Sequence, residues 1–171
     1  MRILLWLISL FIITVYAADK PSFVLNTNAF LDSGALPVAY TCDGKDISPE
    51  LDWSNLPAKT ETLVLIFSDP TAPKNIFYHW VLYNIPKTTT SLAEGVNPTQ
   101  MGIGKNSWGK AKYNGPCPPK DSAHTYFFDL YALDTKLNLP ANADGQTVVD
   151  AMKNHIIGKT QLSTVYMRWL L

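Results

Sequence analysis

The stretch TLVLIFSDPTAP, Thr62 to Pro73, is an unbroken apolar run followed by an acidic residue and a proline-rich turn. A continuous apolar run of this length is typical of a strand that is buried on both faces. Asp69 follows the run and precedes Pro70. Because a residue before proline is restricted to extended backbone, the side chain of Asp69 should point in a fixed direction. The stretch therefore predicts a buried strand with a carboxylate at the point where the strand meets a loop.

Further strands are expected on both sides of this stretch. Aromatic and β-branched residues favour strands at Tyr78–Ile85 and Thr125–Leu133, which end before Pro86 and Asp134. Shorter candidates are residues 22–26, 38–42 and 164–170. Because strands do not alternate with helices, the sequence predicts a mainly β protein, a β-sandwich, and disfavours a doubly wound α/β fold.

One helix is predicted near the C-terminus. Asp144 can cap it, and Gly158 stands where a helix usually stops. Apolar positions recur at the spacing of one helical face: Val148, Ala151, Met152, His155 and Ile156. His155 is therefore expected to be a packed histidine. Residues 43–57 and 87–112 are expected to form long structured loops, helped by the restricted φ of proline.

The N-terminus predicts export. Arg2 precedes an apolar run from Ile3 to Val15, whereas a bilayer-spanning helix needs roughly 20 residues. Small residues at Val15 and Ala17 complete the pattern of a secretory signal peptide at residues 1–17, cleaved after Ala17. An uncleaved anchor is the alternative. No repeat or linker interrupts residues 18–171, so a single periplasmic or secreted domain is predicted.

Charge and cysteine content restrict the classes of partner. The chain has 14 basic and 14 acidic side chains, so it lacks the basic field that nucleic-acid binding requires. In an exported chain the pair Cys42 and Cys117 predicts a disulfide, with two buried thiols as the alternative. A zinc site is disfavoured because neither cysteine belongs to a Cys-x-x-Cys pair.

Two of the three histidines lie at the start of predicted strands. If those strands are close, His79 and His124 can share one end of the sandwich with Asp69. Such a group can bind a divalent metal, or it can bind an anion through protonated imidazoles, tyrosine hydroxyls and backbone N–H groups. Gly115 would let the backbone approach a ligand closely. Asp69 can equally cap its own turn, so spacing alone leaves the metal, anion and turn-cap interpretations open.

Taken in order, the motifs resemble the phosphatidylethanolamine-binding protein family. They are more narrowly similar to its bacterial YbhB/YbcL branch, often called Raf kinase inhibitor-like proteins. The matching motifs are Asp69-Pro-x-Ala-Pro73, His79-Trp-Val-Leu-Tyr-Asn-Ile-Pro86, Gly115-Pro-x-Pro-Pro119, His124-x-Tyr126, Cys42-Asp-Gly-x-x-Ile-Ser-Pro49 with Trp53, and Tyr131-Ala-Leu-Asp134.

The resemblance implies a Greek-key β-sandwich of two antiparallel sheets with one or two peripheral helices. It also implies a small anion pocket, which in relatives accepts phosphate or a phospholipid head group. The residues carried over to that pocket are Asp69, Pro73, His79, Gly115, Pro119, His124 and Tyr126. Thr71 stands where the family usually has a second aspartate, and this change is expected to weaken or shift ligand preference.

The function expected is that of an exported, non-catalytic binding protein without metal or cofactor. Its role would be regulatory or inhibitory toward a protein partner, and homodimerisation is an open possibility. One alternative is a hydrolase or metal-dependent enzyme that uses Asp69, His79 and His124. Another is a protease inhibitor that acts through a surface loop, residues 87–112. Nucleophilic catalysis has little support, because no Gly-x-Ser-x-Gly motif is present and Cys117 has Cys42 as a partner.

Overall fold

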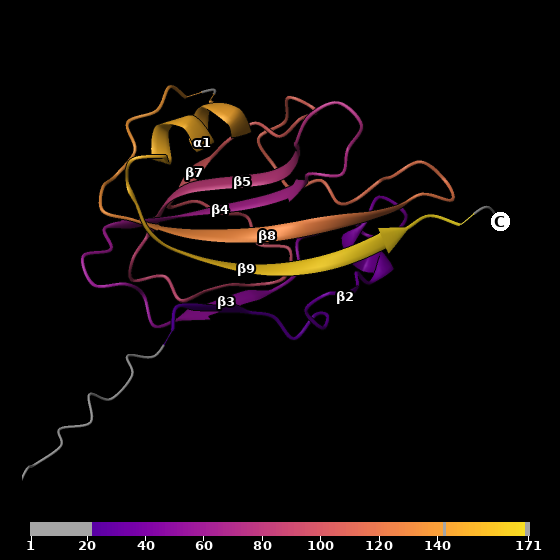
Figure 1. Cartoon of the computed structure of the whole chain (residues 1–171), viewed down its shortest axis with the longest axis horizontal. Helices are drawn as coiled ribbons and strands as arrows, with labels where there is room; N and C mark the ends of the chain where they lie inside the picture. Colours follow the sequence, from indigo (N-terminus) through magenta and orange to yellow (C-terminus); the bar gives the residue numbers. More distant parts are fainter. Residues whose placement is uncertain (1–21, 142, 170–171) are drawn as a thin grey trace, which may run out of the picture.

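The computed structural model describes residues 22–141 and 143–169, so the predicted signal peptide lies outside the described residues. The prediction of a mainly β protein is confirmed (Figure 1). One sheet has the order β1-β3-β6, formed by β1 (Val24–Asn26), β3 (Leu51–Ser54) and β6 (Ser91–Leu92). The other has the order β2-β9-β8-β4-β5-β7, formed by β2 (Gly34–Ala35), β4 (Thr62–Asp69), β5 (Phe77–Pro86), β7 (Gly102–Ile103), β8 (Ala123–Leu133) and β9 (Ile156–Met167). The helix α1 spans Gly145–Met152.

Strand β4 is buried along its whole length, as its apolar run predicts. Leu63, Leu65 and Phe67 belong to the core shared with the smaller sheet. Val64 and Ile66 belong to a second core on the α1 side. Figure 1 accordingly shows α1 and β3 on opposite sides of the larger sheet. The larger sheet is therefore the middle layer, between α1 and the smaller sheet. Successive side chains of β4 point alternately into the two cores.

Two strand predictions need correction. Residues Val38–Tyr40 form a short 3-10 helix, because Pro37 fixes the entry and the backbone N–H and hydroxyl of Thr41 both donate to the Val38 carbonyl. The last strand begins at Ile156, well before residue 164. The predicted loops also contain short strands: β3 in residues 43–57, and β6 and β7 in residues 87–112. The β2–β9 pair is parallel, so the larger sheet is not wholly antiparallel.

The helix is shorter than its apolar spacing predicts. Its cap is confirmed, since the Asp144 carboxylate accepts from Thr147 N at 2.8 Å, but it ends at Met152. The prediction of a packed His155 is wrong, because its side chain is 44% exposed and its Nδ1 lies 2.9 Å from Asp134 Oδ1. Pairing with β8 extends β9 back to Ile156, so Gly158 is a strand residue. Within the described residues no helix is long and apolar enough to cross a membrane.

The predicted disulfide between Cys42 and Cys117 is present, with a Cα–Cα distance of 5.4 Å. A neighbouring ion pair reinforces this tie, because Arg168 at the end of β9 donates to both carboxylate oxygens of Asp43. This pairing and a hydrogen bond from Tyr166 lower the pKa of Asp43. The loop that begins at Cys42 is thus fixed to two distant segments of the chain.

Replacement of both cysteines, Cys42→Ser with Cys117→Ser, should lower the free energy of unfolding. A cross-link across 75 residues restricts the unfolded chain by about 4 kcal/mol in the chain-entropy model. Urea unfolding of wild type and variant, each with and without reductant, measures this loss. An unfolding midpoint that is the same for both proteins under oxidising conditions would contradict the prediction.

Candidate functional site

Asp69, His124 and Tyr126 lie on one face of the larger sheet. Tyr126 and Phe128 are core residues on the face of β8 toward the smaller sheet, and two-residue alternation places His124 on the same side. Asp69 follows Phe67 on that face of β4. His124 Nδ1 donates to Asp69 Oδ2 at 2.6 Å, and the two side chains are only 11% and 5% exposed.

Asp69 is held from its own turn as well as from His124. Its Oδ1 accepts hydrogen bonds from Thr71 N at 2.7 Å and from Thr71 Oγ1 at 2.6 Å. The turn-cap interpretation therefore holds for Oδ1, whereas Oδ2 pairs with His124. Three donors suit an ionised carboxylate, which can only accept. Thr71 thus orients the carboxylate toward His124.

His79 occupies a β-bulge. The partner on β5 shifts from Trp80 to Tyr78 between two consecutive residues of β4, which leaves His79 as an extra residue. Tyr78 belongs to the core on the α1 side, whereas Trp80 belongs to the core toward the smaller sheet. The His79 ring also packs toward the smaller sheet, 5.3 Å from the rings of both Phe67 and Tyr126. The bulge therefore aims His79 at the same end of the core as Tyr126.

A backbone hydrogen bond fixes the His79 ring. Its Nδ1 donates to the Asn114 carbonyl at 2.9 Å. Burial lowers the pKa of His79, and the Asn114 carbonyl and the negative charge of Asp69 offset part of this effect. The free protein therefore favours the neutral imidazole, with its proton on Nδ1.

Asp46 holds the loop that contacts His79, and the sequence reasoning missed it. Its Oδ1 accepts from Gly115 N at 2.6 Å, and its Oδ2 accepts from Asn114 Nδ2 at 3.1 Å. Its own backbone is left-handed, with a φ of 55°. The motif that starts at Cys42 contains Asp46, but its spacing alone does not indicate this contact.

Gly115 is required for packing between loops. A Cβ on it would lie 2.2 Å from the Tyr40 carbonyl oxygen and 2.7 Å from Thr41 Cα. The structure therefore explains this glycine by close packing of two loops, a different reason from the ligand approach that the sequence suggests. Gly115 does lie next to Asn114, whose carbonyl contacts His79.

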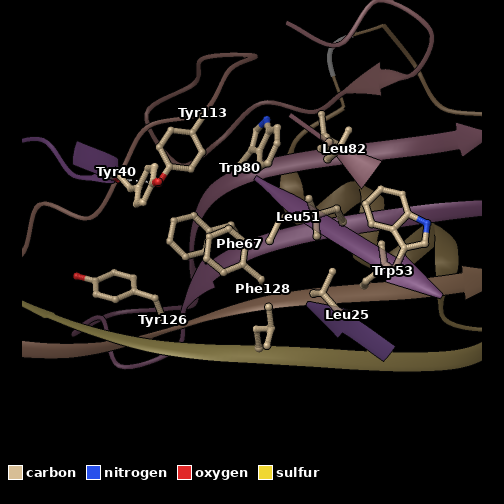
Figure 2. Close-up of a cluster of buried hydrophobic side chains, with 14 of the residues drawn as sticks. Leu25, Tyr40, Leu51, Trp53, Phe67, Trp80, Leu82, Tyr113, Tyr126 and Phe128 are labelled. Carbon is tan, nitrogen blue, oxygen red and sulfur yellow. Dashed lines mark hydrogen bonds between the residues drawn. The ribbon is translucent and has the colours of Figure 1, made fainter. Parts of the chain in front are cut away.

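Aromatic rings enclose the two imidazoles. Trp108, which the sequence reasoning also missed, packs edge-on against His79 at 5.2 Å and against Phe77 at 4.6 Å. Figure 2 shows the Tyr126 hydroxyl pointing away from the stacked rings of Phe67 and Phe128. Within the described residues this hydroxyl makes no hydrogen bond, and burial together with Asp69 raises its pKa well above the ordinary value. Tyr126 is therefore a protonated hydroxyl that is available as a donor.

The two prolines of the predicted site lie on exposed loops. Pro73 lines a hollow of about 1100 Å³ beside the start of α1, and Asp69, His79 and His124 are not among its lining residues. The Pro119 carbonyl accepts from Ser122 N at 3.2 Å, and Ser122 Oγ lies 3.1 Å from His124 Nε2.

The structure thus brings four predicted residues together, which we call the polar cluster: Asp69, His79, His124 and Tyr126. No group of three or more metal-ligating side chains is arranged to hold a metal ion within residues 22–141 and 143–169.

Stability should depend on pH through His79. An unfolded histidine binds a proton near pH 6.5, whereas burial lowers the pKa of native His79, so the unfolded state binds more protons below that pH. Stability is therefore lost as pH falls from 7 to 5. Chemical unfolding should show a smaller loss in His79→Gln than in wild type.

The control for this measurement is His155→Gln, which removes an exposed histidine. If His79→Gln and wild type lose the same stability over this range, the assigned role of His79 is wrong.

Comparison with known proteins identifies relatives over nearly the whole described chain. The phosphatidylethanolamine-binding protein family model matches residues 26–167. A UPF0098 protein of Methanothermobacter thermautotrophicus is 44% identical over 149 residues, which cover 84% of this chain and 98% of the relative. A UPF0098 protein of Aquifex aeolicus is 40% identical over 160 residues, which cover 90% of this chain and 94% of the relative.

Two solved structures share the fold. E. coli YbcL, described as a new member of the mammalian family, aligns with a TM-score of 0.81 at 30% identity, covering 86% of this chain and 99% of YbcL. A putative homolog from Chlamydia trachomatis aligns with a TM-score of 0.80 at 34% identity, covering 86% of this chain and 98% of the homolog. The match to YbcL agrees with the branch that the motifs indicate. The chain belongs to the phosphatidylethanolamine-binding protein family.

Proposed function

We propose that the polar cluster binds a small phosphate-like anion and that the protein acts by binding, without turnover. The observation that carries this proposal is the occupancy of both Nδ1 nitrogens: Asn114 uses that of His79, and Asp69 uses that of His124. His79 Nε2 and the Tyr126 hydroxyl remain for a ligand, whereas His124 Nε2 lies 3.1 Å from Ser122 Oγ. Imidazolium and hydroxyl donors are suited to phosphate oxygens.

Proton uptake would accompany binding. The carboxylate of Asp69 lies 2.6 Å from His124 Nδ1, so this pair offers an anionic ligand no net positive charge. The positive charge that attracts the ligand must then come from His79. In the free protein, burial lowers the pKa of this histidine. A bound anion favours the protonated ring, because opposite charges stabilise each other strongly at a buried site. Anion and proton thus bind His79 cooperatively.

Thr71 supports a preference for ligands without a cationic group. It stands where the family usually has a second aspartate, and it presents a neutral hydroxyl that donates to Asp69. The polar cluster consequently holds one carboxylate, and Thr71 and His124 take three of its about four acceptor positions. A ligand ammonium group would find only the remaining acceptor position of this one carboxylate. We expect inorganic phosphate to bind at least as well as phosphoethanolamine.

Export and regulation complete the proposal. Residues 1–17 have the pattern of a signal peptide, and the Cys42–Cys117 disulfide is the kind of cross-link that persists in an oxidising compartment. In the periplasm or outside the cell, the anion-bound form would act on a protein partner in a regulatory or inhibitory manner. Family membership makes this role reasonable, although fold alone does not fix function.

Phosphate should shift the ring ¹⁵N signals of His79 and His124 and leave those of His155 unchanged. His79→Gln and His124→Gln should each weaken phosphate binding about 10- to 100-fold, the range for one charge-assisted hydrogen bond. His155→Gln is the matched control, because Asp134 pairs with His155 outside the polar cluster. Histidine signals that respond to neither phosphate nor phosphoethanolamine would refute the site, and hydrolysis of phosphate esters would favour the enzyme alternative.

Anion affinity should rise as pH falls from 8 to 6. Binding requires a proton on His79 that the free protein resists, so each step toward acid lowers the cost of supplying it. Sulfate is the best probe, since it stays dianionic across this range and its own titration does not contribute. Calorimetry in two buffers of different ionisation enthalpy should show proton uptake. A sulfate affinity that is independent of pH would contradict the coupling.

A further inference from the structure

Ser122 completes a chain of three side chains. Asp69 Oδ2 accepts from His124 Nδ1 at 2.6 Å, and His124 Nε2 lies 3.1 Å from Ser122 Oγ. A carboxylate, an imidazole and a hydroxyl are connected through the same atoms in serine nucleophiles that a histidine activates. Such arrangements are recognised by geometry and not by a sequence motif, so the missing Gly-x-Ser-x-Gly pattern does not exclude one.

The local structure keeps this chain of groups in place. Ser122 lies directly before β8, two residues from His124, and its Oγ reaches His124 Nε2 at 3.1 Å. Thr71 anchors the far end by donating twice to Asp69. Asp69 and His124 are nearly buried, whereas Ser122 is only partly buried. The hydroxyl is therefore oriented by a rigid pair and remains open to a reagent.

A hydrogen-bond donor stands next along the strand. Tyr126 lies two residues beyond His124, and the two rings stack at 6.3 Å. Its hydroxyl makes no hydrogen bond in the part of the chain that the structure describes, and burial keeps it protonated. A preorganised donor of this kind can stabilise the oxyanion that forms when a carbonyl is attacked.

We propose that Ser122 is a nucleophile that takes the acyl group of carboxylic esters, with His124 as general base and Asp69 as positioning residue. Ser122 Oγ forms a bond to the ester carbonyl carbon, and the hydroxyl proton moves to His124 Nε2. The carbon–oxygen bond to the alcohol then breaks, and His124 returns the proton to the departing oxygen. The products are acyl-Ser122 and a free alcohol.

This proposal goes beyond anion binding and does not depend on it. It concerns one covalent transfer per molecule, whereas turnover would also need water to attack acyl-Ser122. Two other pairs of residues serve as comparisons, because each lacks one of the three groups of the Asp69–His124–Ser122 arrangement. Among residues 22–141 and 143–169, His155 pairs with Asp134 and has no serine partner, and Ser163 donates to Asp32 and has no histidine partner.

The test uses p-nitrophenyl acetate with the full mature protein, read by release of p-nitrophenolate and by intact mass. Acetylated protein is then digested, and the label is assigned by peptide mapping. Ser122→Ala removes a single partly buried hydroxyl, so it should fold, and it reports the background from lysine acetylation. Wild type and His155→Gln should gain one acetyl group on Ser122, the Ser163 peptide should stay unlabelled, and His124→Gln should react at least about 10²-fold more slowly.

Asp69→Asn tests the positioning role. An amide can donate to His124 Nδ1 and so favour the other ring tautomer, which cannot accept the serine proton. We expect slower acetylation together with a changed pattern of His124 ring ¹⁵N shifts. Slower acetylation with an unchanged tautomer would contradict the role given to Asp69.

Two results would overturn the nucleophile itself: wild type that reacts no faster than Ser122→Ala, or a label that maps to another residue. If His124→Gln fails to fold, the wild-type peptide map still shows whether Ser122 is the residue that becomes acetylated. Phosphate titration of the same samples separates the two proposals, since either can fail while the other stands.

Discussion

The polar cluster depends on the hydrogen bonds of one carboxylate at the end of a fully buried strand. Asp69 receives two donors from Thr71 and one from His124, so a charge that would be costly in a core is satisfied on both oxygens. This arrangement fixes the turn after β4 and the start of β8 relative to each other. The proposed anion contacts and the proposed nucleophile both depend on the resulting position of His124.

A second set of contacts brings His79 to the same place. The bulge in β5 turns its ring toward Tyr126, and the Asn114 carbonyl holds that ring in one tautomer. Asp46 in turn holds Asn114 and Gly115, and the disulfide at Cys42 ties the loop of Asp46 to the same segment. Side chains from segments far apart in sequence thus reach one end of the apolar core, where burial lowers the pKa of His79.

The sequence predicts much of this arrangement because its strongest signals are local. The apolar run of β4, the proline after Asp69 and the aromatic strand at Thr125–Leu133 are visible in the chain, and motif order identifies the family. The bulge at His79 is set by pairing between strands, so no local pattern marks it. Asp46 escapes prediction because its partners lie in a distant loop, and Ser122 because its contact with His124 depends on the backbone before β8. His155 is misassigned because pairing with β8 overrides its helical spacing.

The fold therefore supports a site in which two histidines are fixed through Nδ1. His79 Nε2 and the Tyr126 hydroxyl are left for a ligand, while His124 Nε2 contacts Ser122. We expect an oxyanion to occupy this position. Crystals soaked in selenate, an anomalously scattering analogue of sulfate, test that claim most directly. We expect an anomalous peak within hydrogen-bonding distance of His79 Nε2 and the Tyr126 hydroxyl. Peaks found only elsewhere on the molecule, with the polar cluster empty at saturating selenate, would contradict it.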